Sequence, residues 1–196
     1  MLLLDTTGSM QGEASQHSFV SRLDVVKRSI GFIVKELADA DTEFEQGNGQ
    51  GGLRTVTFSG GYANDIGDLN PGNLDQKFNN IVWEGSTLIV AGFSKILDIY
   101  NGQFGDLPLY NQPKMVTLVI TDGEALDIND LAVMILTMDF TNIYLVFALI
   151  GFGTDYENAR VRLAELSKLN NHIRVIEMKN ETQAHEIANV CLSLVR

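Results

Sequence analysis

The sequence predicts an α/β fold: a doubly wound, mostly parallel β-sheet with helices on both faces. Three observations predict it. Apolar runs alternate with amphipathic helical patterns along the chain, as in repeated β-α-β units. The run Asn142–Ile150 is almost entirely apolar, which is typical of a strand covered on both faces. The pair Gly60-Gly61 makes a tight turn between two strand-like runs, which predicts one antiparallel edge strand.

The first half of the chain begins with the apolar run Met1–Asp5, which predicts a buried strand. Ser21–Ala38 carries apolar residues at helical spacing, so we expect an amphipathic helix there. Asp39–Gly52 is acidic and then rich in glycine, which indicates a flexible loop. Leu53–Ser59 and Tyr62–Ile66 are the two strands that we expect on either side of the glycine turn.

The second half of the chain starts with two predicted helices, Asn73–Val82 and Leu88–Tyr100. Glycines and prolines then mark Asn101–Pro113 as a loop. The remaining predicted elements alternate between strand and helix, in the order Lys114–Thr121, Asp127–Met138, Asn142–Ile150, Tyr156–Leu169, Ile173–Glu177 and Thr182–Val195. This alternation predicts further parallel strands joined by crossover helices.

The composition fits one domain over residues 1–196 and excludes several kinds of partner. The chain is 45% hydrophobic, which suits a well-buried core. Its net charge of −11 repels nucleic-acid phosphates and anionic membranes, so we expect no nucleic-acid partner. No apolar run reaches the ~20 residues of a membrane helix, so we expect no membrane insertion. The single cysteine, Cys191, lies in a helical apolar pattern and is expected to be a buried, inert thiol.

The beginning of the chain bears on its location. Met1 leads straight into a predicted core strand, and no basic segment of a signal peptide precedes it. We therefore expect either a cytoplasmic protein or a domain cut from a longer chain.

Polar side chains gather at the ends of two predicted strands and before one helix. Asp5-Thr6-Thr7-Gly8-Ser9 follows the first strand, Thr121-Asp122-Gly123 ends a later strand, and Gly85-Ser86-Thr87 precedes a helix. In doubly wound sheets, ligands bind outside the carboxyl ends of the strands, so Asp5 and Asp122 share one crevice if their strands are neighbours. Carboxylate and hydroxyl oxygens suit Mg²⁺, which prefers oxygen ligands and keeps several waters.

These segments resemble the metal-ion-dependent adhesion site of the von Willebrand factor A domain family. That site has an Asp-x-Ser-x-Ser motif after the first strand, a threonine in the second loop and an aspartate after the fourth strand. The residues that match are Asp5, Thr7, Ser9, Thr87 and Asp122. Thr7 stands where the motif usually has a serine, and it also carries a hydroxyl. The resemblance covers essentially the whole chain, so it implies the Rossmann-like fold of this family. It also implies that these residues hold one divalent cation, Mg²⁺ or else Mn²⁺ or Ca²⁺.

The same resemblance implies a binding domain without enzymatic activity. The open coordination position of the cation would accept an acidic side chain of a partner protein, in adhesion or in a scaffold. If Asp122 contacts the cation only through a water molecule, the cation keeps more uncompensated positive charge and attracts the partner's carboxylate more strongly. If Asp122 binds the cation directly, this attraction is weaker. Family members couple this difference to movement of the final helix, which corresponds to Thr182–Val195. Because Asp122 is expected on a loop, its replacement by alanine should lower cation affinity and leave the fold intact.

Two alternatives remain open from the residues. The first is a Mg²⁺-dependent hydrolase on a Rossmann-like sheet, with Asp5 and Asp122 around the metal and Glu84 or Glu124 as the base or nucleophile. The second is a scaffold module in which the metal site is vestigial. The sequence has no convincing nucleophile–base pair, no phosphate-binding loop and no clustered histidines, which favours the binding domain.

Overall fold

The computed structural model describes residues 1–17, 19–40, 52–123 and 125–195. Within these residues, six strands form one sheet in the order β3-β2-β1-β4-β5-β6. Their bounds are Leu2–Asp5 (β1), Leu53–Ser59 (β2), Tyr62–Leu69 (β3), Met115–Thr121 (β4), Ile143–Leu149 (β5) and Ile173–Glu177 (β6). Every neighbouring pair is parallel except β2 and β3, so the predicted fold class is confirmed.

The antiparallel edge strand β3 follows β2 through the predicted glycine turn, with Ser59 paired to Tyr62. It runs to Leu69, which is farther than the predicted Tyr62–Ile66. A bulge at Ile66 of β3, opposite Thr55 and Val56 of β2, shifts the register, and the pairing continues with Gly67 and Asp68. The sequence does not reveal this extension, because backbone pairing rather than an alternating apolar pattern holds the end of β3.

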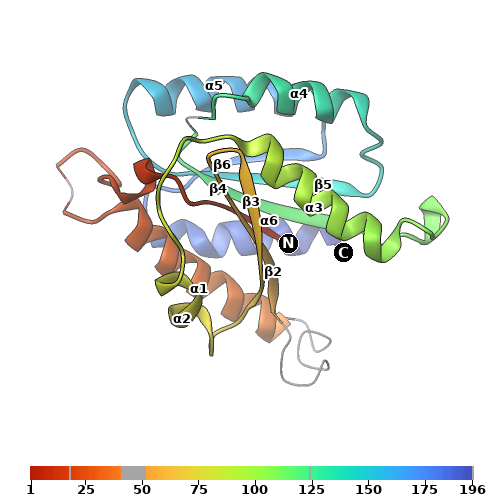
Figure 1. The fold of residues 1–196 in the computed structure, drawn as a ribbon, viewed down its shortest axis with the longest axis horizontal. Coiled ribbons are helices and arrows are strands. Elements are labelled where there is room, and N and C mark those ends of the chain that lie inside the picture. Colours follow the sequence, from red (N-terminus) through yellow and green to blue (C-terminus); the bar gives the residue numbers. More distant parts are fainter. Residues whose placement is uncertain (18, 41–51, 124, 196) are drawn as a thin grey trace.

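Six helices cover the two faces of the sheet within the described residues (Figure 1). On one face lie α1 (Arg22–Ala40) and α6 (Ala184–Val195), with the short α2 (Leu74–Asn79) against α1. On the other face lie α3 (Ile89–Phe104), α4 (Ile128–Thr137) and α5 (Thr154–Leu169). No helix of the described residues is long and apolar enough to cross a membrane.

The strand β1 shows how the sheet separates two cores. Leu2 and Leu4 pack into the core under α1 and α6, whereas Leu3 packs into the core under α3, α4 and α5. Side chains alternate between the faces of a strand, so an entirely apolar run is needed where both faces are covered. Cys191 of α6 is buried in the first core, and this burial raises the pKa of its thiol to about 11, as expected of an inert cysteine.

Several predicted helix boundaries shift by a few residues. The helix α1 continues to Ala40, so Asp39 is helical, and residues 41–51 of the predicted loop lie outside the described residues. The helix α3 runs to Phe104 and includes the first residues of the predicted loop Asn101–Pro113, because one glycine does not stop a packed helix. The final helix α6 begins at Ala184, after a 3₁₀ turn.

The topology brings two carboxyl ends together. The strands β1 and β4 are neighbours, with Leu4 paired to Ile120. The chain leaves β1 toward β2 on one side and returns to β4 on the other, so the winding direction reverses between them. This is the topological switch point at which doubly wound sheets bind ligands, and it places the loops after Asp5 and Thr121 side by side, as predicted.

Candidate metal-binding site

The loop after β1 is organised by the side chain of Asp5, which is fully buried. Its Oδ1 accepts two hydrogen bonds from Thr7, one from the backbone nitrogen at 3.0 Å and one from Oγ1 at 2.7 Å. An aspartate that binds its own chain two residues later stabilises a tight turn, and here the turn leads into the 3₁₀ helix Gly8–Gln11. The turn fixes the Thr7 hydroxyl beside the Asp5 carboxylate.

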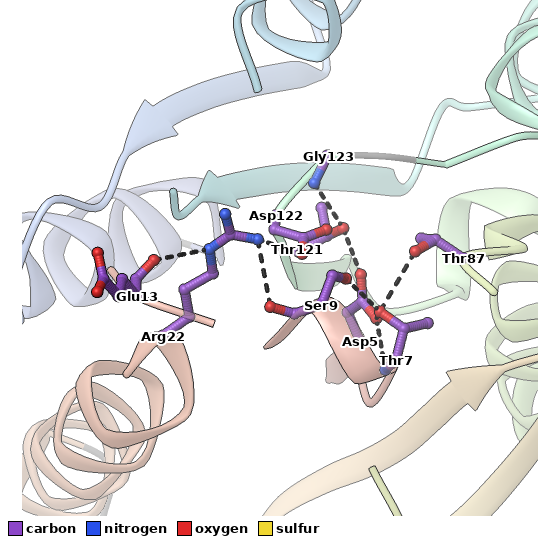
Figure 2. A network of polar contacts seen from close by, with 9 residues as sticks. All are labelled: Asp5, Thr7, Ser9, Glu13, Arg22, Thr87, Thr121, Asp122 and Gly123. Carbon is purple, nitrogen blue, oxygen red and sulfur yellow. Dashed lines mark hydrogen bonds and ion pairs between the residues drawn. The ribbon is translucent and has the colours of Figure 1, made fainter. Parts of the chain in front are cut away.

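Three hydroxyls form a chain next to this carboxylate (Figure 2). Thr7 Oγ1 lies 3.0 Å from Ser9 Oγ, and Thr87 Oγ1 donates to Thr7 Oγ1 at 3.3 Å. The loop that carries Thr87 is held by a backbone bond from Glu84 to the carbonyl of Thr6. Four of the predicted residues therefore meet through direct contacts.

Thr121 is a polar neighbour of Asp5 that the ligand prediction did not include. Its Oγ1 donates to Asp5 Oδ2 at 2.7 Å and accepts a bond from the backbone nitrogen of Gly123 at 3.0 Å. Both oxygens of Asp5 are thus hydrogen-bonded. The signal for this contact lies in the register, because Thr121 is one residue past the paired Ile120 and so falls beside Asp5.

The Asp5 carboxyl is held in an environment that disfavours its charge. Burial, and then the negative charge of Asp122, raise its pKa from 3.8 to about 6, although hydrogen bonds from Thr121 and Thr7 act in the opposite direction. A cation placed between these two buried carboxylates would offset their mutual repulsion.

Asp122 lies on the loop after β4, but it is as buried as a core residue, at 1% exposure. Its Oδ2 accepts a charged hydrogen bond from Nη1 of Arg22 at 2.7 Å (Figure 2). Its Oδ1 is buried and has no hydrogen-bond partner within the described structure. Asp122 therefore lies on a loop, as expected, but Arg22 at the start of α1 pairs with it, a contact that the sequence did not indicate. No sequence pattern links these two residues, which lie a hundred positions apart.

A second missed residue, Asp127, ties the loops together. It precedes α4, but its carboxylate makes no capping bond to that helix. Instead Oδ1 and Oδ2 accept bonds from the backbone nitrogens of Ile89 and Val90, at 2.8 and 2.9 Å, and so cap α3. Leu126 also donates its backbone N–H to the carbonyl of Thr87 at 2.9 Å. These bonds join the loop of Asp122 to the loop of Thr87.

The donor set fits a hard divalent cation. In the part of the chain that the structure describes, no group of three or more histidine, cysteine, aspartate or glutamate side chains could hold a metal ion. The predicted residues instead offer two carboxylates and three hydroxyls, all oxygen donors of the kind that suits Mg²⁺, Mn²⁺ or Ca²⁺. The unpartnered Oδ1 of Asp122 is a buried acceptor that a cation, or a water bound to one, would satisfy.

Of the two residues named as base or nucleophile for the hydrolase alternative, the structure describes only Glu84. The side chain of Glu84 is exposed, and the hydrogen bond that joins this residue to the site comes from its backbone. The other candidate base, Glu124, lies outside the described residues.

Comparison with known proteins identifies the fold. No protein-family model and no curated protein sequence matches the chain. Among solved structures, the PilB minor pilin of Streptococcus sanguinis superimposes on 98% of this chain and 61% of its own, with a TM-score of 0.66 and 12% identity. A von Willebrand factor type A protein from Catenulispora acidiphila matches 99% of this chain and 42% of its own, with a TM-score of 0.58 and 14% identity.

A third similar structure carries a metal. It is the proximal thread matrix protein 1 of the mussel byssus with a zinc-occupied MIDAS motif, which matches 98% of this chain and 46% of its own, with a TM-score of 0.59 and 15% identity. This chain thus spans about two fifths to three fifths of the length of these proteins. The likeness confirms the von Willebrand factor A fold that the sequence resemblance implied.

Proposed function

We propose that this chain is a metal-dependent protein-interaction domain and not an enzyme. Asp5, Thr7, Ser9, Thr87 and Asp122 would hold one hard divalent cation, with Mg²⁺ as the first candidate and Mn²⁺ or Ca²⁺ as alternatives. The observation that carries the proposal is the unpartnered, buried Oδ1 of Asp122 near a second buried carboxylate and a chain of three hydroxyls. Residues 1–196 would act as one domain.

The chain's own groups have separate tasks in this proposal. Asp5 positions Thr7 through two hydrogen bonds and supplies negative charge. The hydroxyls of Thr7, Ser9 and Thr87 offer neutral oxygen donors, which leave much of a cation's charge uncompensated. When bound, the cation supplies a positive centre that accepts one carboxylate oxygen of a partner. With a net charge of −11, the protein otherwise repels acidic surfaces.

The surroundings of the site support a protein partner over a small anion. Large apolar side chains are exposed in segments next to the carboxyl ends of the parallel strands: Phe19 after β1, Tyr62 at the start of β3, Leu126 after β4 and Phe152 after β5. Exposed aromatic side chains are enriched at protein-binding surfaces. A partner surface could cover them while one of its acidic side chains reaches the site.

The similar structures support this reading at the level of fold. One has a zinc-occupied site of the same name, and another is a minor pilin. Those proteins are named for a byssus and a pilus, which favours a place outside the cell over the cytoplasmic location expected from the first residues. No observation favours the hydrolase alternative, since Glu84 is exposed.

The test is a calorimetric titration of chelator-treated protein with Mg²⁺ and with Mn²⁺. We expect saturable uptake of one ion, weakened about tenfold or more by Thr87→Ala because a hydroxyl ligand is lost. Thr137→Ala is the matched control, since its hydroxyl binds only carbonyls of its own helix. Capture of partners from source lysate should then require the metal and be abolished by chelator. Absence of saturable uptake at millimolar metal would refute the proposal.

A further inference from the structure

A fixed positive charge lies next to the candidate site. Nη1 of Arg22 is 2.7 Å from Asp122 Oδ2, and the Arg22 side chain is only 12% exposed. The same Nη1 donates to the carbonyl of Ser9 at 3.3 Å, and Nε donates to the carbonyl of Glu13 at 3.1 Å. The guanidinium thus contacts both the loop after β1 and the loop after β4 (Figure 2).

A third loop leaves room for the guanidinium. Gly151, which follows β5, has φ of +132°, and a Cβ built on it would lie 3.2 Å from Arg22 Cζ and Nε. A side chain at this position would press on the guanidinium, so the glycine allows the backbone to approach it closely. Three loops at the carboxyl ends of β1, β4 and β5 therefore confine Arg22 in the orientation that reaches Asp122.

This confinement divides the two oxygens of Asp122 between different tasks. Oδ2 is taken by Arg22, and Oδ1 remains buried without a partner in the described structure. A guanidinium at hydrogen-bond distance offsets much of the carboxylate charge. Asp122 is therefore a weaker counter-charge for a cation than a free aspartate would be.

We infer that Arg22 is a positioning residue that weakens cation binding at the site and, by doing so, strengthens the attraction of the bound cation for an anionic partner group. The inference rests on the proposed function and adds a residue to it. When the protein ligands carry less negative charge, the bound cation keeps more net positive charge and attracts an additional anionic ligand more strongly. The affinity for the metal and the affinity of the loaded site for a carboxylate should then change in opposite directions when the Arg22 charge is removed.

The experiment uses Mn²⁺ and acetate as probes on the whole chain. Free Mn²⁺ is measured by electron paramagnetic resonance, and acetate binding is followed as displacement of water from bound Mn²⁺ by proton relaxation. In Arg22→Gln, which keeps a donor for Asp122 but removes the charge, we expect Mn²⁺ to bind about fivefold to tenfold more tightly and acetate to bind more weakly by a similar factor. A general loosening of the site would weaken both.

Two further variants complete the test. Arg28→Gln makes the same charge change on an exposed residue of α1 and should alter neither constant. Arg22→Lys keeps the charge but loses the planar guanidinium and its hydrogen bonds to Ser9 and Glu13, so both constants should change less than in Arg22→Gln. If Arg22→Gln fails to fold with Mn²⁺ present, Arg22→Lys carries the test, and a shift of both constants in the same direction by about tenfold or more would overturn the inference.

Shifts of both constants in the same direction in Arg22→Gln, or no shift, would also overturn it while leaving the metal site itself intact. If the wild-type chain binds no Mn²⁺, the proposed function fails and the inference falls with it. The two failures are therefore distinguishable in one series of measurements.

Discussion

The hydroxyl of Thr121 donates a hydrogen bond to the carboxylate of Asp5 across the boundary between β4 and β1, with 2.7 Å between Oγ1 and Oδ2. Together with the bonds from Thr7, it gives each oxygen of this buried carboxylate at least one hydrogen-bond donor. These bonds favour the charged form of Asp5, but burial and the charge of Asp122 outweigh them. Ionisation of Asp5 in the folded protein therefore lowers the free energy of unfolding, by an amount that depends on pH.

We expect the metal-free protein to lose stability as the pH rises from about 4 to about 6. The pKa of Asp5 is raised in the folded state, from 3.8 to about 6, so the protonated form stabilises the fold and this contribution disappears as the carboxyl ionises. The shift corresponds to roughly 3 kcal/mol of unfolding free energy. Urea denaturation in chelator at several pH values measures it. Asp5→Asn should remove this part of the pH dependence, and parallel curves for variant and wild type would contradict the assignment.

Thr121→Val should destabilise the protein at neutral pH by about 1–3 kcal/mol, because it leaves a buried oxygen of Asp5 without its donor. It should also lower cation affinity about tenfold, since Asp5 loses a group that holds it. Denaturant unfolding and Mn²⁺ titration measure the two effects. Thr117→Val provides a matched control on the same strand, because the Thr117 hydroxyl is buried with no hydrogen-bond partner in the described structure. Equal effects of the two substitutions would show that the hydrogen bond to Asp5 is unimportant.

The sequence predicts the sheet and the meeting of its loops because apolar patterning decides both. The strands β1 and β5 are almost entirely apolar, β1 ends in Asp5, and the Thr-Asp pair Thr121-Asp122 stands at the end of β4. The resemblance supplied Thr7, Ser9 and Thr87, and the structure brings their hydroxyls together. Their role as metal ligands stays a prediction.

The residues that the sequence did not reveal are those whose partners are distant in the chain. Arg22 looks like an ordinary first residue of an amphipathic helix, and its bond to Asp122 exists only because β1 and β4 are neighbours. Asp127 looks like the cap of the helix that it precedes, but it caps a different helix. Local patterns describe neighbours along the chain, so contacts of this kind require the tertiary structure.

Asp127→Ala should weaken cation binding without touching the site. Its carboxylate caps α3 at Ile89 and Val90, so its loss should cost about 1–2 kcal/mol of stability and loosen the start of the helix that follows Thr87. A severalfold loss of Mn²⁺ affinity is expected from a less firmly held Thr87. Asp130→Ala removes an exposed carboxylate from the first turn of α4 and should change neither quantity. An unchanged Mn²⁺ affinity in Asp127→Ala would mean that the two loops are not coupled.

Replacing Asp122 should destabilise the metal-free protein, in contrast to what a loop position alone suggests. Asp122→Asn relieves the repulsion of Asp5, but it also leaves the guanidinium of Arg22 largely buried without its counter-charge. Removing one partner of a buried pair generally costs more than the pair itself contributes, so we expect a net loss of about 1–3 kcal/mol.

A double-mutant cycle with Arg22→Gln, measured by urea unfolding in chelator, separates the two effects. The double variant should be less destabilised than the sum of the single variants, because the second substitution removes the unpaired charge that the first one leaves. Strict additivity would show that the ion pair contributes no coupling energy to the fold.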